Sequence, residues 1–138
     1  MVGPMKRMLL LVLVCVAPSA ANEKTRPVKV IEGQLSRSLV KKVMERGPQR
    51  FVAGLRVSAH LVEGRFVGFR IDGFTSEGPL VNSRHILPGD VVVRVNREPI
   101  ERPEQFMRAW DVVRDADNLD VLLLRGGQQL RYHWKIIP

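Results

Sequence analysis

The segment of residues 87–96, with the sequence LPGDVVVRVN, places a tight turn directly before a run of β-branched residues. Gly89 can adopt a turn conformation that is closed to other residues, and the Asp90 carboxylate can accept hydrogen bonds from backbone amides in such a turn. The three alternate valines that follow have the spacing of a strand with one face in the core. The chain is therefore expected to build a sheet around a buried strand that begins at this turn.

The residues on both sides of this strand predict a mixture of helices and strands. Apolar residues at helical spacing predict an amphipathic helix over residues 36–46. Alternation predicts strands over residues 55–62 and 65–74 around the tight turn at Glu63-Gly64. Further elements are expected at residues 91–96 (strand), from Pro103 (helix), and at 119–125 and 129–137 (strands around Gly126-Gly127). This order predicts an α+β fold or a small, partly open barrel capped by helices.

The N-terminus has the three-part pattern of a secretory signal. Lys6 and Arg7 precede an apolar run at residues 8–17, and small residues follow at 18–21. Ten apolar residues rise only about 15 Å as a helix, which is half of a hydrocarbon core of about 30 Å. We therefore expect a cleaved signal over residues 1–21 rather than a transmembrane span.

The length and the cysteine content indicate how the mature chain, without this leader, is organised. The chain has 138 residues, which leaves room for one core. We expect a polar linker at residues 22–34 and a single domain over residues 35–138. Cys15 is the only cysteine and lies in the leader, so the mature chain would carry neither disulfide nor thiol chemistry. The protein is expected to be periplasmic or otherwise exported, and anchored in the inner membrane if the leader is not cleaved.

The net charge of +8 raises the question of anionic partners. The basic residues are spread along the chain with no Lys/Arg run longer than two, and no aromatic residues interleave with them as in a stacking platform. We therefore expect a basic, soluble surface and do not expect nucleic acid as a partner. Binding to anionic lipid or nucleic acid stays open as an alternative.

The pattern of titratable residues gives no support for catalysis. His60, His85 and His133 lie far apart, and none has a second ligand at metal-binding spacing. His85 lies near Asp90 and two serines, but the sequence shows no nucleophile elbow and no oxyanion hole. A phosphate-binding glycine loop is also missing. We expect no enzymatic activity, no metal, no cofactor and no small-molecule substrate.

The run GPLVNSRHILPGDVVVRVNREPIERPEQF, residues 78–106, resembles the PDZ domain. The usual pattern is a small-residue loop, G-L-x-x-G-D, an apolar strand, an Asn-Gly turn and a helix. The sequence departs from it at His85, at Arg97 and at Arg102, where a glycine, a glycine and a helix cap are usual. The resemblance implies a PDZ-like, partly open β-barrel or sandwich of about five or six strands capped by two helices. The helix at residues 36–46 would be an N-terminal addition.

A narrower resemblance covers residues 35–137. The runs LSRSLVKKVME and RVSAHLVEGRFVGFRIDGF look like the C-terminal PDZ region of the type II secretion (general secretion pathway) protein C family. That family is an inner-membrane component of the secretion machine. Its further domain, which docks on the secretin, has no counterpart here, so secretin binding by that route is not carried over. Its motif G-x-x-x-G-[FY]-R-[IV] is filled by Gly64, Gly68, Phe69, Arg70 and Ile71.

PDZ domains bind partners by adding an extended segment as a strand, and this resemblance implies where such a groove would lie. The receiving strand would be residues 69–74, and the opposing wall would be the helix at residues 103–114. Amides at residues 67–69 would hold a terminal carboxylate. Each residue also has a plainer interpretation as core, as surface or, for Gly68, as a β-bulge. The expected groove residues are Val67, Gly68, Phe69, Arg70, Ile71, Met107 and Trp110, while Gly89 and Asp90 are expected to be structural.

The sequence therefore favours an exported, non-enzymatic module that binds a protein or peptide segment in the cell envelope. The resemblance implies an accessory or scaffold component related to type II secretion, with components of that machine among its partners. One alternative is a substrate-recognition or regulatory subunit of a periplasmic protease, since PDZ domains often serve proteases in this way. The other is the basic envelope protein that binds anionic lipid or nucleic acid.

Overall fold

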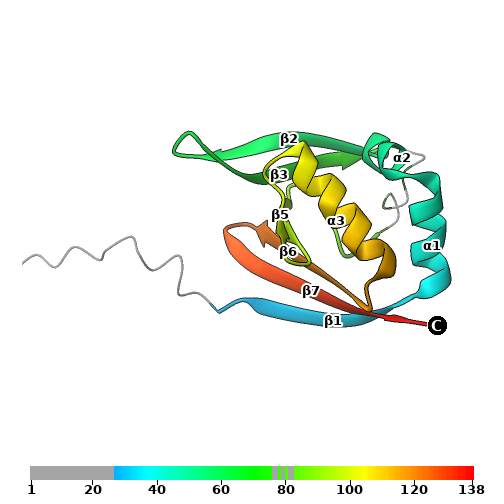
Figure 1. The fold of residues 1–138 in the computed structure, drawn as a ribbon. Coiled ribbons are helices and arrows are strands. Elements are labelled where there is room, and N and C mark those ends of the chain that lie inside the picture. The colour runs from blue at the N-terminus through cyan, green and yellow to red at the C-terminus, as the bar shows by residue number, and fades with distance from the viewer. Residues whose placement is uncertain (1–26, 76–77, 79, 81–82) are drawn as a thin grey trace, which may run out of the picture.

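The computed structural model describes residues 27–75, 78, 80 and 83–138, and the expected signal over residues 1–21 lies outside them. These residues form one sheet and three helices (Figure 1). The strand order in the sheet is β1-β7-β6-β4-β3-β2, and β5 pairs with β4. This arrangement confirms the α+β, partly open sandwich. The elements are β1 (Lys29–Ser36), α1 (Arg37–Arg46), α2 (Pro48–Ala53), β2 (Leu55–Val62), β3 (Arg65–Phe74), β4 (Val91–Val95), β5 (Glu98–Pro99), α3 (Pro103–Asp115), β6 (Asn118–Arg125) and β7 (Gln128–Ile137).

Strand β1 corrects the expectation of a polar linker. Residues 29–34, which were expected to belong to the linker, form most of a strand that pairs in parallel with β7 along its whole length. Ile31 and Leu35 of this strand pack against the main core. A parallel partner is distant in sequence by necessity. The local pattern of polar residues therefore gave no sign of the pairing that orders this segment.

The helices begin and end at residues with clear local reasons. Ser36 caps α1, because its hydroxyl accepts a hydrogen bond from the Leu39 amide at 3.2 Å. Gly47 ends α1 with a φ of 86°. Pro48 then occupies the first turn of the short helix α2. Helix α3 starts at Pro103, as the sequence predicts.

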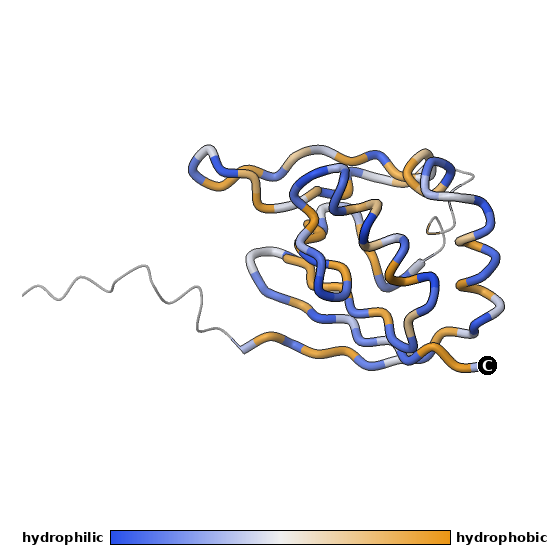
Figure 2. Tube along the Cα trace, viewed as in Figure 1, coloured by the Kyte–Doolittle hydropathy of each residue, from blue (hydrophilic) through white to orange (hydrophobic). Residues whose placement is uncertain are grey.

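Hydrophobic and hydrophilic segments alternate along the whole described chain (Figure 2), and the buried residues form two clusters. The main cluster joins β3, β6 and β7 to the loop that precedes β4. A second cluster joins α1, α3 and the end of β7 through Val40, Val113 and Ile136. No helix in the described ranges is long and apolar enough to cross a membrane. The main cluster consists of Ile71, Ile86, Val121, Leu123, Leu130, Tyr132 and Trp134.

Leu123 provides the test of this core, since its side chain is fully buried. We expect Leu123→Ala to lower the free energy of unfolding by about 2–5 kcal/mol, because it removes apolar contacts and leaves a cavity. The exposed Val112 of α3 is the matched control, and Val112→Ala should change the value by less than about 0.5 kcal/mol. Urea denaturation followed by circular dichroism measures both. Similar values for the two variants would contradict the assignment of the core.

Candidate functional site

The turn before β4 is organised around the carboxylate of Asp90, which is only 1% exposed. Its Oδ2 accepts a hydrogen bond from the Leu87 amide at 2.8 Å, across the turn. Gly89, inside the turn, has a φ of 94°, a conformation that L side chains rarely adopt. These contacts explain the sequence Pro-Gly-Asp in structural terms: the glycine makes the turn and the aspartate closes it.

Arg125, at the end of β6, supplies the charge that allows Asp90 to be buried. Its Nε donates to Asp90 Oδ1 and one terminal nitrogen donates to Asp90 Oδ2, both at 2.8 Å. The same terminal nitrogen also donates to the carbonyl of His85 at 2.9 Å. The hydrogen bonds to Asp90 raise the pKa of Arg125 further above its ordinary value, so the guanidinium stays charged. A paired and hydrogen-bonded charge of this kind is the form in which carboxylates are tolerated in a core.

The same turn fixes strand β3 in the interior of the sheet. The Ile71 amide donates to the carbonyl of Asp90 at 2.8 Å, and the Gly89 amide donates to the carbonyl of Ile71 at 2.7 Å. On its other side β3 pairs with β2 from end to end. The second edge of β3 is already paired from Phe69 to Ile71, so a partner strand cannot add beside these three of the expected residues 69–74.

The sequence did not decide whether Gly68 belongs to a groove or to a β-bulge, and the structure shows that its role is structural. A Cβ built on Gly68 would overlap the carbonyl oxygen of Val92 in β4. The backbone of this neighbouring strand therefore approaches Gly68 closely. A register shift lies beside it, between His60 and Leu61, where Val67 is left without a directly opposite residue. This is the β-bulge that was held as the plainer interpretation of Gly68. The amides at residues 67–69 thus lie within a strand rather than in a loop.

Ile71 and Phe69 belong to the packed side of the sheet, whereas Arg70 lies on the opposite side. Ile71 is part of the main core cluster. The ring of Phe69 makes an edge-on contact with Phe66, with 5.0 Å between centroids. Arg70 is exposed, and its terminal nitrogen lies 3.0 Å from Nδ1 of His60. The predicted groove residues of β3 therefore do not form one surface.

The two predicted groove residues of α3 have different environments. Trp110 is buried and packs on Phe51 of α2, with 5.4 Å between ring centroids. Its indole N–H finds no acceptor among the described residues. Met107, in contrast, is 44% exposed. Among the apolar residues predicted for the groove, Met107 is thus the most exposed.

The edge that the structure leaves open belongs to β2. This strand comes last in the strand order and pairs only with β3. Val57 lies directly opposite the core residue Ile71 and therefore faces the core side of the sheet. Leu61 lies four residues further along the same strand, so it faces the same side. Their side chains are nevertheless 40% and 57% exposed. The sequence indicated these apolar positions, but alternation alone does not tell an edge strand from an interior one.

The opposite edge, β1, differs in one decisive respect. Its core-side residues Ile31 and Leu35 pack against the main cluster. Its exposed Val30 lies between Lys29 and Ile31, so Val30 points away from that core side. The core side is therefore covered at β1 and uncovered at β2.

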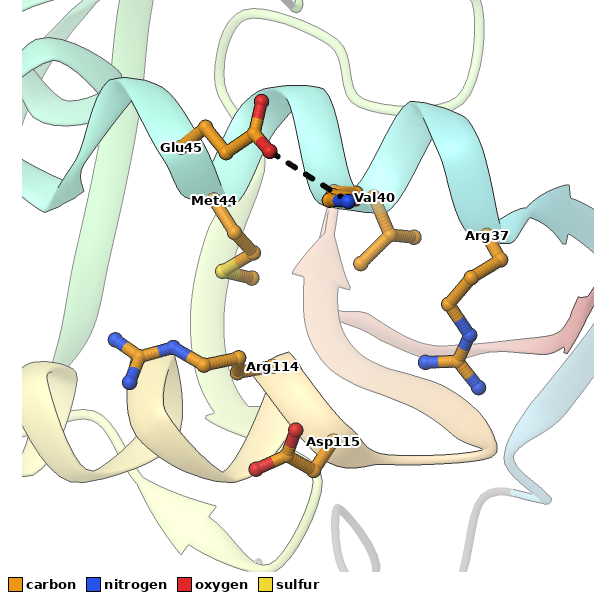
Figure 3. Close-up of a pocket in the computed structure, with 7 residues that line it drawn as sticks. Arg37, Val40, Met44, Glu45, Arg114 and Asp115 are labelled. Atoms are coloured by element: carbon orange, nitrogen blue, oxygen red, sulfur yellow. Dashed lines mark ion pairs between the residues drawn. The ribbon is translucent and has the colours of Figure 1, made fainter.

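A cavity of about 450 Å³ lies between α1 and α3, with Val40 and Met44 on its apolar floor (Figure 3). Its charges are balanced by neighbours. Lys41 pairs with Glu45 at 3.9 Å, and Arg37 pairs with Asp117 at 3.5 Å. Nothing in this arrangement calls for an external charged group.

Asp120 of β6 also has structural partners, since its carboxylate pairs with Arg131 and His133. Burial alone would raise the pKa of Asp120, but hydrogen bonds from His133 and Arg131 outweigh it and hold the pKa below its ordinary value. Within residues 27–75, 78, 80 and 83–138, no group of three or more His, Cys, Asp or Glu residues could hold a metal ion. The feature that these contacts leave to be explained is the open edge of β2.

Comparison with solved structures identifies this architecture. The PDZ domain of EpsC from Vibrio cholerae has a TM-score of 0.51 and 18% identity, over 72% of this chain and 93% of that chain. A shorter form of the same domain scores 0.43 at 18% identity, over 59% of this chain and 93% of that one. The PDZ domain of the pullulanase C protein of the type II secretion system from Klebsiella pneumoniae, in complex with fatty acid, scores 0.48 at 21% identity, over 71% and 99%. No family model and no curated protein matches the sequence. The first of these likenesses shows the PDZ fold.

Removing the partner of Asp90 tests the role of the buried pair. We expect Arg125→Met to lower the free energy of unfolding by about 3 kcal/mol, because it leaves a buried carboxylate without its counter-charge. Arg94→Met, at an exposed position of β4, should change the value by less than about 0.5 kcal/mol. Chemical denaturation of both variants gives the comparison. An effect of Arg125→Met as small as that of the control would contradict this role.

The contact between Gly68 and β4 makes a separate prediction. Gly68→Ala should destabilise the protein by about 1–3 kcal/mol, because the added methyl group requires β3 and β4 to move apart. Arg65→Ala, at the exposed start of the same strand, serves as the control and should have little effect. Thermal unfolding measures both. If Gly68→Ala kept full stability, the close approach of the strands would be wrong.

Proposed function

We propose that this protein is an exported interaction module that binds an extended segment of another protein at the open edge of β2. The observation that carries the proposal is the exposure of Val57 and Leu61 on the core side of this edge. Side chains that face the core side are normally covered by the layer packed there. A partner segment would provide the cover that the chain itself does not.

Strand β2 has the properties of an edge that receives another strand. Exposed edges are usually protected by prolines, by inward-pointing charges or by very short strands. β2 has eight residues, contains no proline and presents apolar residues at its core side. A segment added along Leu55–Val62 would form backbone hydrogen bonds, while its alternate side chains would contact Val57 and Leu61. Helix α3, with the exposed Met107, would form the second wall of the groove.

The cellular setting is also a proposal. The secretory pattern at residues 1–21 supports export to the periplasm, with anchoring in the inner membrane if the leader is retained. The resemblance of residues 35–137 to the type II secretion protein C family supports an accessory or scaffold role related to type II secretion. We propose binding without turnover, since no catalytic arrangement emerges from the sequence. A protein segment of the cell envelope is the partner that fits these features.

A charge placed in the apolar strip of β2 tests the proposal. Peptides that bind the full protein would first be selected from a display library of random 12-residue segments, and their affinities measured by fluorescence anisotropy. We expect Val57→Lys to weaken binding about 10-fold or more, because the partner would lose apolar contact and meet an unpaired charge. The side chain is exposed in the free protein, so the thermal stability should change little.

The matched control is the same substitution at the other edge of the sheet. Val30 of β1 is also exposed, and Val30→Lys should leave peptide affinity unchanged. If both variants bound peptide as well as the original protein, the β2 edge would not be the binding site. Failure to select any peptide would contradict the proposed function itself.

A further inference from the structure

The two outermost strands of the sheet, β1 and β2, differ in their protection against pairing with another chain. Lys29 lies two residues before Ile31 and therefore on the core side of β1, where an inward-pointing charge discourages the addition of a strand. The core side of β2 carries no charge from Leu55 to Leu61. An unprotected edge is a template for any chain that presents a matching strand, and a second copy of the same protein is one such chain.

The core side of β2 matches itself when two copies of the strand run antiparallel about a two-fold axis at Ala59. In this register Val57 of each copy lies opposite Leu61 of the other, because the two residues are equally far from Ala59. The apolar side chains that are exposed in the single chain would thus cover each other. Pairing about a two-fold axis is isologous, so each of these contacts is made twice.

The outward side of β2 favours the same register. Ser58 would lie opposite His60 of the other copy, and Arg56 opposite Val62, so no two like charges would face each other. An axis at Ser58 would instead place Arg56 opposite His60, and an axis at His60 would place two histidines opposite each other. The axis at Ala59 avoids both arrangements.

The charges at the two ends of β2 are complementary in this register. Arg56 and Glu63, the residue directly after β2, are exposed, and neither forms an ion pair with another described residue. Because Val62 would lie opposite Arg56 of the other copy, Glu63 would come next to that arginine at both ends of the paired strands. The turn of this hairpin projects beyond the helices (Figure 1), where another molecule can reach it.

We propose that a second copy of the protein pairs antiparallel with β2 about Ala59, and that this dimer keeps the binding edge covered until a partner segment displaces it. The displacement rests on the proposed function, since the second copy and the partner would use the same backbone groups of β2. A contact limited to one strand from each copy falls below the size of a standard interface. The dimer is therefore expected to be weak and reversible, as a cover that gives way to a partner must be.

Sedimentation velocity of the full protein over about 10–1,000 μM tests the dimer. We expect the mean mass to rise toward that of two chains. Val57→Lys should weaken the dimer about 10-fold or more, because each copy would place a charge opposite Leu61 of the other. Val30→Lys, at the β1 edge, is the control and should associate as the original protein does. Absence of association in the original protein, or association that is unchanged in Val57→Lys, would overturn the inference.

A charge exchange tests the register and does not depend on the apolar residues. Arg56→Glu and Glu63→Arg should each weaken the dimer by about 3- to 10-fold, because each variant brings like charges together at both ends of the paired strands. The combined variant restores opposite charges and should return to within about 2-fold of the original. Thermal unfolding would show that the three variants remain folded. A combined variant that dimerises more weakly than either single variant would overturn the inference.

A peptide selected for binding at β2 distinguishes the dimer from the proposed function. With saturating peptide, the mass should fall to that of one chain with one peptide, and the apparent peptide affinity should weaken as the protein concentration rises. A dimer that holds two peptides would overturn the inference and leave the proposed function standing. A dimer that responds to Val57→Lys and to the charge exchange, although no peptide can be selected, would support the self-pairing and contradict the proposed function.

Discussion

The buried pair of Asp90 and Arg125 is the interaction on which the rest of the structure depends. One carboxylate closes the turn at Leu87 and binds the end of β6, while Arg125 also holds the carbonyl of His85. The turn made in this way presents its own backbone to Ile71 of β3. Because β3 is thereby held between two neighbours, β2 becomes the last strand and keeps an open edge. The motif that defines the fold is thus remote from the proposed site, yet it decides which strand can bind.

The sequence predicted the positions of the helices and strands well, but it did not predict which strands pair with one another. Alternation located β2 and β3 within the observed bounds, and Pro103 marked the start of α3. These features depend on residues close in sequence. The order of strands depends on pairing between distant segments, so the open edge was placed one strand away from its true position. The same reason explains why β1 was taken for a linker, since its partner β7 lies at the other end of the domain.

Two features of the region around β2 are left without a partner, namely apolar side chains along the strand and positive charge near its beginning. Val57 and Leu61 lie on the core side of the sheet without cover. Lys42, Arg46 and Arg50 line a cavity and form no ion pair with another described residue. Arg108 and Arg114 of α3 and Arg131 of β7, in contrast, are each paired with an acid. In the proposed binding mode, backbone hydrogen bonds at the strand edge supply affinity that depends little on the sequence of the partner. The exposure of Val57 and Leu61 in the free protein supports a role of this strand in binding.

Hydrogen exchange of the backbone amides tests the central claim most directly, namely that β2 receives a partner strand. The full protein would be compared with and without a selected peptide at saturating concentration. The account predicts slower exchange along Leu55–Val62, because amides at an open edge gain hydrogen-bond acceptors when a strand is added. Exchange along Lys29–Ser36 of β1 should stay unchanged. Protection of β1 with no change at β2 would contradict the account.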